Sequence, residues 1–563
     1  MDNTTHILKT LNEFFEDSVK KFSDRPALSF AYEIPITYKE MLDKVITVAD
    51  LLEKKGILYG DRVAILGENS PNWGISYFAI LRAGAVAVPI LPDFPEADIR
   101  HILSDSEAKI LFTTQKQLQK VGDLGNSKLK HIITLDDFKT DDQALDVEPF
   151  SNIMDLAIDF IKKIPKHIGL KTKEITEDDL ASIIYTSGTS GHSKAVMLTH
   201  KNLLSNAITM NKLIDINPDW TFLSVITLSH SLEFTTGFLF PLFNGARIVY
   251  LGASPTPSLL EKACKVEKPQ AICAVPLILE KIYKKKVLPV LERNSFIKII
   301  TKVPGIKKKI YKKINNKLIE FFGGKLIVMA IGGALFNIKA ETFFRNSGFP
   351  YLVGYGLTET SPLLAGGPFG DRTIKISSTG KPVPGVEIKI DNADKDTGIG
   401  DILARGPNVM KGYYKNPELT REVLSDDGWF KTGDLGYFDN FNNLHITGRS
   451  KNMILMSNGE NIYPEAIEEK INSAIYVMES LVIENNNRLE AWVYPDYDLI
   501  DSDTRGKTEK QKREFIIQML DRLKKDINSQ LSSFSKISRV IEQKEPFVKT
   551  ATLKIKRYLY SHR

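Results

Sequence analysis

The chain has 563 residues, of which 42% are hydrophobic and 26% are charged, and its formal net charge is +6. This length exceeds what one hydrophobic core serves, so two or more domains are expected, and the composition is typical of a globular protein rather than a disordered one. Two cysteines exclude a disulfide framework and favour a reducing compartment. The N-terminal residues lack the basic and apolar regions of a signal peptide. The most apolar stretch, 75–91, is interrupted and too short to predict a membrane span.

The first ninety residues alternate between helical and strand-like patterns. Amphipathic spacing predicts helices over 7–22 and 38–55, and a further helix is expected over 72–83. Apolar runs predict buried strands over 61–66 and 85–89. This alternation indicates a parallel α/β architecture. No reactive side chains gather here, so we interpret the region as scaffold.

A glycine- and hydroxyl-rich segment follows a polar stretch at 115–150. It reads Tyr185-Thr-Ser-Gly-Thr-Ser-Gly-His-Ser-Lys194, between apolar flanks that predict two strands. Successive backbone N–H groups in such a loop suit phosphate oxygens, and the lysine adds a mobile positive charge. The spacing differs from a Walker A loop, in which Ser or Thr follows the lysine. A glycine-rich turn without a ligand is the alternative interpretation.

These residues resemble the phosphate loop of the adenylate-forming superfamily, which contains acyl-CoA synthetases, luciferases and peptide-synthetase adenylation domains. Ser193 stands where that family usually has proline, which should loosen the loop without removing a phosphate donor. The resemblance implies a metal contact from Thr186. It implies ATP contacts from Thr186, Ser187, Gly188, Thr189, Ser190, Gly191 and Lys194.

A histidine segment, Leu228-Ser-His-Ser-Leu-Glu233, resembles the Leu-x-His-x-x-Glu segment of long-chain acyl-CoA synthetases. The resemblance implies a catalytic role for His230, beside the acyl carboxylate and the pantetheine tunnel. A buried structural histidine is the alternative. Gly237 is then expected beside the acyl pocket, where the missing side chain leaves room for a chain.

Two glycine-containing turns, 331–334 and 355–360, follow strand-like runs, and open α/β sheets place ligands at such strand ends. They resemble the adenine-binding turn and the Tyr-Gly-x-Thr-Glu motif of the same family. The resemblance implies a metal role for Glu359, since Mg²⁺ prefers carboxylate, phosphate and water oxygens. It implies nucleotide contacts from Gly333, Ala334, Tyr355, Gly356 and Thr358.

The segments Gly428-Trp-Phe-Lys-Thr-Gly-Asp434 and Gly448-Arg-Ser-Lys451 also match family motifs. By resemblance, Asp434 and Arg449 contact the ribose and Lys451 is the hinge about which a small domain rotates. The last motif, Pro546 to Arg557, resembles the family's C-terminal motif and makes Lys554 the catalytic lysine. It carries Leu553 where glycine is common, and a basic exposed tail is the alternative interpretation.

The resemblance covers about residues 10–560. It implies an α/β protein with a large N-terminal domain, 1–448, built from two α/β subdomains plus a β-barrel-like subdomain. A small mobile α+β domain, 449–563, carries the catalytic lysine.

Residues 281–317 hold thirteen Lys or Arg residues and one Glu, interleaved with apolar residues. A basic amphipathic surface of this kind can lie against an anionic leaflet, where each charge contributes about 1 kcal/mol. A solvated helix is the alternative. Nucleic acid is not expected, because no known nucleic-acid module accompanies the stretch.

The implied function is ATP-dependent activation of a fatty acid to acyl-adenylate and transfer to CoA, with Mg²⁺ as cofactor. The histidine segment and the C-terminal motif favour a long-chain acid. A carrier-protein acceptor, a medium-chain or aryl acid, and a binding protein with an inactive nucleotide site stay open, although the intact motifs argue against the last. A cytoplasmic protein is expected, with peripheral contact at the inner membrane face as an open addition. The oligomeric state is open.

Overall fold

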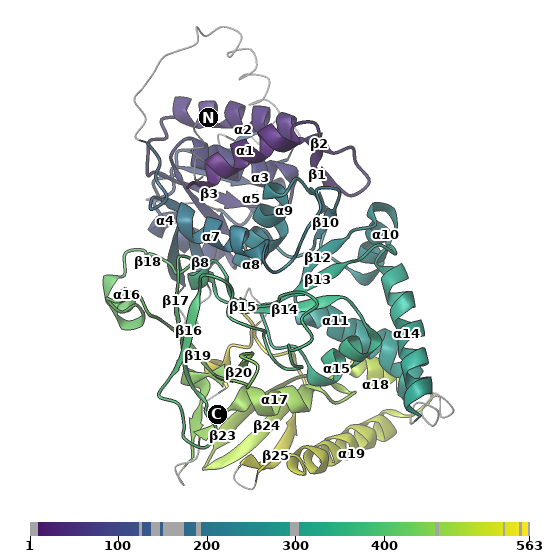
Figure 1. Ribbon diagram of the computed structural model, residues 1–563. Coiled ribbons are helices and arrows are strands. Elements are labelled where there is room, and N and C mark those ends of the chain that lie inside the picture. Colours follow the sequence, from purple (N-terminus) through teal and green to yellow (C-terminus); the bar gives the residue numbers. More distant parts are fainter. Residues whose placement is uncertain are drawn as a thin grey trace.

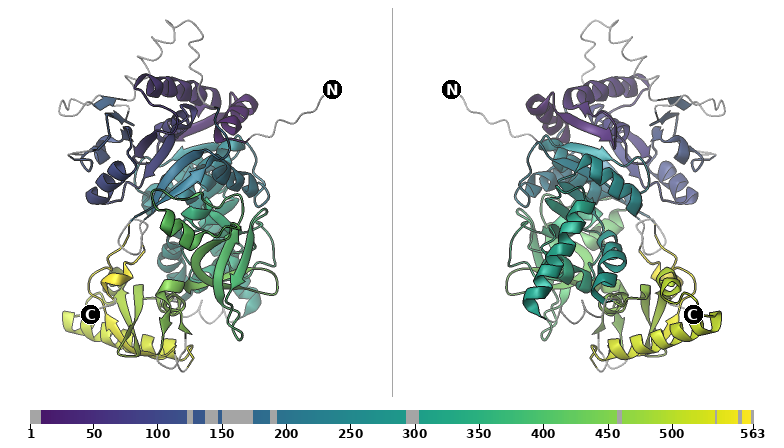
Figure 2. Two further views of the ribbon diagram at one scale, coloured as in Figure 1. Left: turned by 90° about the vertical axis from the view of Figure 1, so that its left-hand side faces the viewer. Right: turned by 90° about the vertical axis from the view of Figure 1, so that its right-hand side faces the viewer.

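The structure is a computed structural model that describes residues 9–122, 127–136, 174–186, 193–292, 303–456, 461–532, 535–550 and 554–560, and the backbone of 147–149. The chain runs from N-terminal sheets at one end of an elongated molecule to a smaller C-terminal unit at the other (Figures 1 and 2). The predicted α/β architecture is confirmed by two large, mainly parallel sheets.

The first sheet is parallel from β8 to β7, and β9 and β18 are added antiparallel at one edge. In order across the sheet, its described strands are β18 (Gly412–Tyr413), β9 (Lys194–Thr199), β8 (Leu180–Thr186), β4 (Val86–Ile90), β3 (Arg62–Leu66), β5 (Ile110–Thr113), β6 (His131–Thr134) and β7 (Val147–Pro149).

The second sheet is parallel from β1 to β14, with one antiparallel strand at each edge. In order, its described strands are β15 (Leu363–Gly366), β14 (Tyr351–Gly356), β13 (Val328–Ile331), β12 (Ala271–Ala274), β10 (Thr221–Ser224), β11 (Arg247–Tyr250), β1 (Pro26–Phe30) and β2 (Ile36–Thr37).

Side-chain caps set the starts of the early helices. Thr37 caps one helix with Glu40 in a capping box, and Ser70 caps the next, with Pro71 at its first position. The helices of this part are α1 (Leu11–Phe22), α2 (Tyr38–Lys54), α3 (Pro71–Arg82), α4 (Glu96–Asp105), α5 (Gln115–Leu118), α7 (His200–Met210), α8 (Ser231–Glu233), η1 (Phe234–Leu239), α9 (Phe240–Phe243), α10 (Pro257–Glu267), α11 (Pro276–Ile282), η2 (Tyr283–Val287), α12 (Leu288–Glu292), α14 (Pro304–Phe321) and α15 (Ile338–Ser347). Of these, η1 and η2 are π-helical.

Helix α3 explains the most apolar stretch of the sequence. Every residue from Trp73 to Leu81 is buried. The helix contacts α1 and α2, strands β3 and β4 of the first sheet, and β1 of the second. A helix enclosed on all sides loses the polar face of a surface helix. No helix within the described ranges combines the length and hydrophobicity that a membrane span requires.

The expected β-barrel-like subdomain is instead an open sheet in the described part of the chain. Strands β16 (Glu387–Asp391), β17 (Gly400–Arg405), β19 (Phe430–Phe438) and β20 (Leu444–Arg449) form an antiparallel sheet in that order, and the edge strands β16 and β20 do not pair with each other. Four short strands are too few to close around a packed interior. Helix α16 (Pro417–Val423) lies beside β18 and β19.

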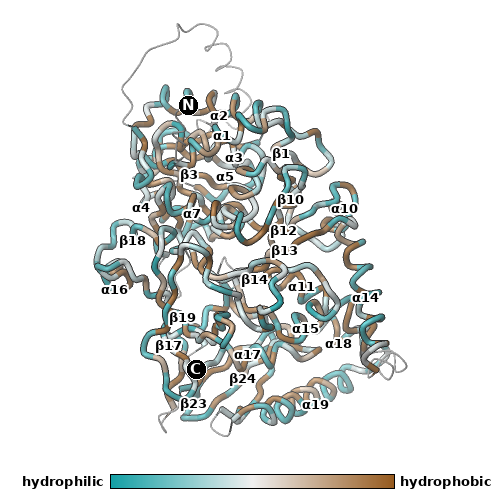
Figure 3. Tube along the Cα trace, viewed as in Figure 1, coloured by the Kyte–Doolittle hydropathy of each residue, from teal (hydrophilic) through white to brown (hydrophobic). Residues whose placement is uncertain are grey.

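The C-terminal part is an α+β unit with its own hydrophobic core, as predicted. It contains η4 (Ser450–Asn452), β21 (Ile454–Leu455), β22 (Asn461–Ile462), α17 (Pro464–Asn472), β23 (Val477–Asn485), β24 (Arg488–Pro495), α18 (Tyr497–Asp503), α19 (Glu509–Asn528), β25 (Ile537–Glu542) and η6 (Arg557–Leu559). Helix α19 is mostly hydrophilic along its length, in contrast to β24 (Figure 3). The predicted boundary at 448/449 falls near the end of β20, and the mobility of this unit stays a prediction.

Candidate active site

The strands that flank the predicted phosphate loop are antiparallel neighbours. Thr186 at the end of β8 is paired with Lys194 at the start of β9, and seven residues separate the two in the sequence. Ser187, Gly188, Thr189, Ser190 and Gly191 lie outside the described residues. The Lys194 amine lies 5.1 Å from the centre of the Tyr413 ring, a cation–π distance.

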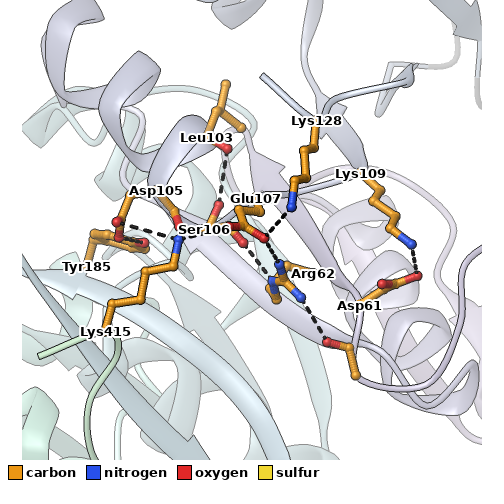
Figure 4. Close-up of polar contacts among 11 residues, drawn as sticks. Asp61, Arg62, Leu103, Asp105, Ser106, Glu107, Lys109, Lys128, Tyr185 and Lys415 are labelled. Atoms are coloured by element: carbon orange, nitrogen blue, oxygen red, sulfur yellow. Dashed lines mark hydrogen bonds and ion pairs between the residues drawn. The ribbon is translucent and has the colours of Figure 1, made fainter. Parts of the chain in front are cut away.

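The strand that leads into this loop is anchored by a polar network (Figure 4). The Tyr185 hydroxyl donates to Asp105 Oδ2 at 2.5 Å, which ties β8 to the end of α4. Lys415 reaches Glu107 at 3.2 Å, and Arg62 reaches the same carboxylate at 2.9 Å. The segment after β18, the strand β3 and the segment after α4 are therefore joined beside Tyr185, at the base of the loop.

Tyr413 joins the loop to the Thr358–Thr360 turn, η3. Its hydroxyl donates to Glu359 Oε1 at 2.9 Å, and its ring faces Lys194. Burial and then the Glu359 carboxylate raise the pKa of Tyr413 well above its ordinary value, so the hydroxyl keeps its proton and remains a donor. The residue acquires its place only through pairing of β18 with β9, and nothing in the sequence pattern indicates that contact.

Asp434 is the centre of a second group of predicted nucleotide residues. Its carboxylate accepts from Tyr355 Oη at 2.7 Å and pairs with Arg449 Nε at 2.9 Å. Asp434 and Arg449 are register partners on β19 and β20, so strand pairing presents them together. The carboxylate is only 5% exposed, and each of its oxygens has a strong donor.

His230 combines a structural contact with a position near Lys554, the predicted catalytic lysine. It caps α8, where its Nδ1 accepts from Leu232 N at 3.2 Å. Burial, and secondarily the Lys554 charge, lower the pKa of His230 to about 4. The imidazole is therefore neutral near pH 7, and the alternative structural role is present in the same residue.

Lys554 makes two hydrogen bonds with Thr550. Thr550 N donates to Lys554 O at 2.8 Å, and Lys554 N donates to Thr550 Oγ1 at 3.2 Å. Lys554 keeps solvent access, yet protein surrounds it and lowers the pKa of its amine by desolvation, as the Arg449 charge also does. The Asp434 and Glu359 carboxylates act in the opposite direction. Predicted residues from 230 to 554 are therefore brought into one electrostatic neighbourhood. Leu553 lies outside the described residues.

The turns predicted to face adenine have backbones that require glycine. Gly333 follows β13 with a φ of +87°, and both it and Ala334 are exposed. At Gly356 a Cβ atom would lie 1.7 Å from the carbonyl oxygen of Pro362, so no side chain fits. Lys451 lies in η4, two residues after Arg449, and burial lowers the pKa of its amine.

Gly237 departs from its prediction, because the room beside it is filled. A Cβ atom there would lie 2.5 Å from Oε1 of Glu233, whose fully buried carboxyl packs against the glycine. The missing side chain accommodates Glu233 rather than leaving open space for an acyl chain. Burial raises the pKa of Glu233 to about 8, so the carboxyl is mainly protonated at neutral pH.

Comparison with known proteins agrees with this arrangement. The family model for AMP-binding enzymes matches residues 15–414. A long-chain-fatty-acid–CoA ligase of Escherichia coli O157:H7 is 27% identical over 82% of this chain and 81% of its own. The chloroplastic long-chain-fatty-acid–[acyl-carrier-protein] ligase AEE15 of Arabidopsis thaliana is 27% identical over 87% of this chain and 76% of its own.

Solved structures show the same fold. The anthranilate CoA ligase AuaEII, solved in complex with anthranoyl-AMP, has a TM-score of 0.78 and 20% identity, and the match covers 98% of this chain and 96% of the other. The family match spans most of the chain, including both large sheets and the loop between β8 and β9. The chain therefore belongs to the AMP-binding enzyme family and is an adenylate-forming acid–thiol ligase, an enzyme class that uses ATP, Mg²⁺ and a thiol such as CoA.

Proposed function

We propose that this enzyme activates a long-chain fatty acid with ATP and transfers the acyl group to CoA. The observation that carries the proposal is that the charges of Arg449, Asp434 and Glu359 all act on the Lys554 amine, since a cation supplied by the C-terminal part would then face the phosphates. The name of the Escherichia coli relative supports the substrate class.

The nucleotide would lie between the two described clusters. Asp434 and Arg449 would hold the ribose hydroxyls, since a carboxylate accepts from two hydroxyls and the guanidinium fixes its orientation. Lys194 would bind the outer phosphates with the loop that follows Thr186. The remaining contacts would come from Gly333, Ala334, Tyr355, Gly356 and Thr358, with Lys451 as the hinge.

A Mg²⁺ ion fits the chemistry of Glu359 and Thr186. Mg²⁺ takes one or two protein oxygens and completes its shell with phosphate and water. The Tyr413 hydroxyl occupies Oε1 of Glu359, which orients the carboxylate and leaves Oε2 for a cation. When bound, the ion would neutralise charge on the phosphates.

The first step joins a carboxylate oxygen of the acid to the α-phosphorus of ATP, and pyrophosphate leaves with the electron pair of the broken P–O bond. Lys554 would stabilise the negative charge that develops there, a contribution of roughly 3–4 kcal/mol for one preorganised donor. The neutral His230 would hold the acid by a hydrogen bond. In the second step the thiolate of CoA attacks the acyl carbon and AMP leaves.

A carrier-protein acceptor is the second candidate, and the name of the Arabidopsis relative favours it. The test measures AMP formation by purified enzyme with ATP and Mg²⁺, on saturated acids from C2 to C18 and on benzoate, with CoA or with holo-acyl carrier protein. A maximum at C12 or longer that requires CoA supports the proposal. If the thioester forms only on the carrier protein, the acceptor is the carrier protein and not CoA. If activity is confined to short or aromatic acids, the substrate is not a long-chain acid.

Membrane contact belongs to the same proposal. Lys307, Lys308, Lys309, Lys312, Lys313 and Lys317 are exposed on α14, and Ile306 keeps 40% of its surface. We propose that these exposed lysines of α14 bind an anionic lipid surface, with each lysine that reaches the surface contributing about 1 kcal/mol. In a flotation assay the enzyme should bind vesicles that contain 30% phosphatidylglycerol. A variant in which Lys307, Lys308 and Lys309 are all changed to Gln should no longer bind them. Equal binding to neutral vesicles would contradict the proposal.

A further inference from the structure

Lys284 differs from the other lysines of the basic stretch because its amine is used inside the protein. It lies in η2, and its Nζ donates to the carbonyl oxygens of Val477 at 2.7 Å and Asn472 at 3.1 Å. Both acceptors belong to the C-terminal part, 188 and 193 residues further along the chain. The composition of residues 281–317 suggests one continuous basic surface. The structure shows instead that Lys284 is directed to the C-terminal part.

The acceptors form the C-terminal end of α17 and the start of β23. The last carbonyls of a helix have no partner within the helix and carry partial negative charge, so they suit a cation. Two more residues of the large N-terminal part bind Ser473, the residue that follows α17. Asn337 Nδ2 donates to Ser473 Oγ at 2.8 Å, and Lys339 Nζ donates to Ser473 O at 3.3 Å. Asn337 is itself fixed, since its N–H donates to Glu280 Oε1 at 2.9 Å.

The charges around Lys284 are mixed. Glu280 and Asp496 favour its protonated form, whereas burial, and to a smaller extent Lys339, disfavour it, and the net result is a lowered pKa. The direct acceptors at Lys284 are neutral carbonyls, so the contact is one of charge with dipole.

Helix α17 also connects this contact to the catalytic lysine. Glu465 lies in its first turn and Glu468 at its middle, and Arg557 pairs with Glu468 and lies 3.8 Å from Glu465. Arg557 is three residues after Lys554 on the same segment. The C-terminal end of α17 is therefore held by Lys284, and its N-terminal half contacts the segment that carries Lys554.

We infer that Lys284 is a positioning residue for acyl-adenylate formation, which acts by fixing α17 so that Lys554 reaches the nucleotide site. The inference rests on the proposed function. Lys554 is needed where charge develops on the phosphates, whereas transfer from acyl-AMP to a thiol breaks the bond to AMP and forms no new charge on pyrophosphate. Loss of Lys284 therefore affects the first step and spares the second.

The experiment compares Lys284→Met with Lys285→Met, a change at the exposed neighbouring lysine. Adenylate formation is measured as ATP–pyrophosphate exchange without CoA, and transfer is measured as thioester formation from presynthesised acyl-AMP and CoA. Lys284→Met should lower the kcat of exchange at least tenfold with little change in the KM for ATP, and should leave transfer within twofold. Lys285→Met should change neither, and Lys284→Arg, which keeps the charge and the donors, should recover most of the exchange rate.

An equal loss in both steps with Lys284→Met, or an unchanged exchange rate, would overturn the inference. A wild-type enzyme without exchange on any acid would refute the proposed function instead. In that case amide hydrogen exchange still tests whether Lys284 fixes α17. Lys284→Met should speed the hydrogen exchange of the amides at 472–480, and Lys285→Met should not. Unchanged protection of those amides would overturn the inference independently of activity.

Discussion

Replacing Gly237 by Ala tests how tightly Glu233 is held beneath helix η1. A Cβ atom at position 237 would meet Glu233 Oε1 at 2.5 Å, so the carboxyl must move by roughly 0.9 Å to reach an ordinary contact of 3.4 Å. Glu233 is fully buried beside the Ser224 hydroxyl and the Cys273 thiol, which lie close enough to lower its pKa. Within the described structure neither of its oxygens has a hydrogen bond of normal geometry, so little holds it except packing.

Two opposing contributions set the size of the effect. Overpacking a buried site costs about 1–3 kcal/mol. Replacing a helical glycine by alanine contributes up to about 1 kcal/mol in the other direction, because the unfolded chain loses freedom and the backbone of Gly237 suits alanine. Gly237→Ala should therefore destabilise the wild-type protein and become neutral or stabilising in a Glu233→Ala background, where the contact is gone.

The assay is urea unfolding followed by tryptophan fluorescence. Trp73 is a local reporter, since its ring centre lies 6.0 Å from that of Phe234 and 6.4 Å from that of Phe238, both in η1. Trp220→Phe, Trp429→Phe and Trp492→Phe remove the signals of the other three tryptophans. A coupling free energy of about 1–3 kcal/mol between positions 233 and 237 is expected. The same cost for Gly237→Ala in both backgrounds would refute the reasoning.

Three further changes test neighbouring parts of the structure. Glu233→Gln should leave stability unchanged below pH 4.5 and raise it at pH 8 and above. The pKa of Glu233 is about 8 in the folded protein against an ordinary 4.5, so the folded state holds a proton that the unfolded chain has lost between these values. The wild-type protein therefore loses up to about 1.4 kcal/mol of stability per pH unit as the pH rises through this range. Urea midpoints from pH 4 to 9 measure this, and parallel pH profiles would contradict it. Arg557→Met leaves the Glu468 carboxylate buried without its cation and should cost about 3–5 kcal/mol in hydrogen exchange of the C-terminal sheet, most of it recovered when Glu468→Gln is added; no recovery would show that the pair is not the cause. Tyr413→Phe removes the donor to Glu359 and should raise the Mg²⁺ concentration for half-maximal activity about tenfold, with the KM for CoA unchanged; a parallel rise in both would show general damage.

Local signals in the sequence were sufficient for much of the fold. The predicted helix at 38–55 begins at Tyr38 because Thr37 and Glu40 form a capping box, and the helix predicted at 72–83 begins one residue early because Ser70 caps it. The glycine turns after β13 and β14 were also evident, since each requires glycine for backbone geometry. These features depend on residues that are close in sequence, and pattern analysis can detect them.

Contacts between segments that are distant in the sequence could not be predicted from local patterns. Tyr413 reaches Glu359 only because β18 is added to β9. Lys284 differs from the other basic residues only because its amine binds the end of α17. The predicted barrel was wrong for a related reason, since strand order within the four-stranded sheet decides closure and no local pattern encodes it. Glu233 was visible as part of a motif, but its position beneath Gly237 depends on the π-helical turn between them.

The enclosure of α3 between the two sheets has a consequence for synthesis on the ribosome. Strands β1 and β2 leave the ribosome first yet belong to the second sheet, whose partners β10 to β15 span residues 221–366, and the first sheet is complete only when β18 at 412–413 has been made. Helix α3 also packs against Phe234 and Phe238 of η1, so its aromatic side chains lack this cover on a nascent chain shorter than about 240 residues, while both sheets are still incomplete. Exposed surface of this kind invites aggregation. Chaperones that bind apolar helices during translation should therefore matter more for this chain than for proteins whose domains follow one another in sequence.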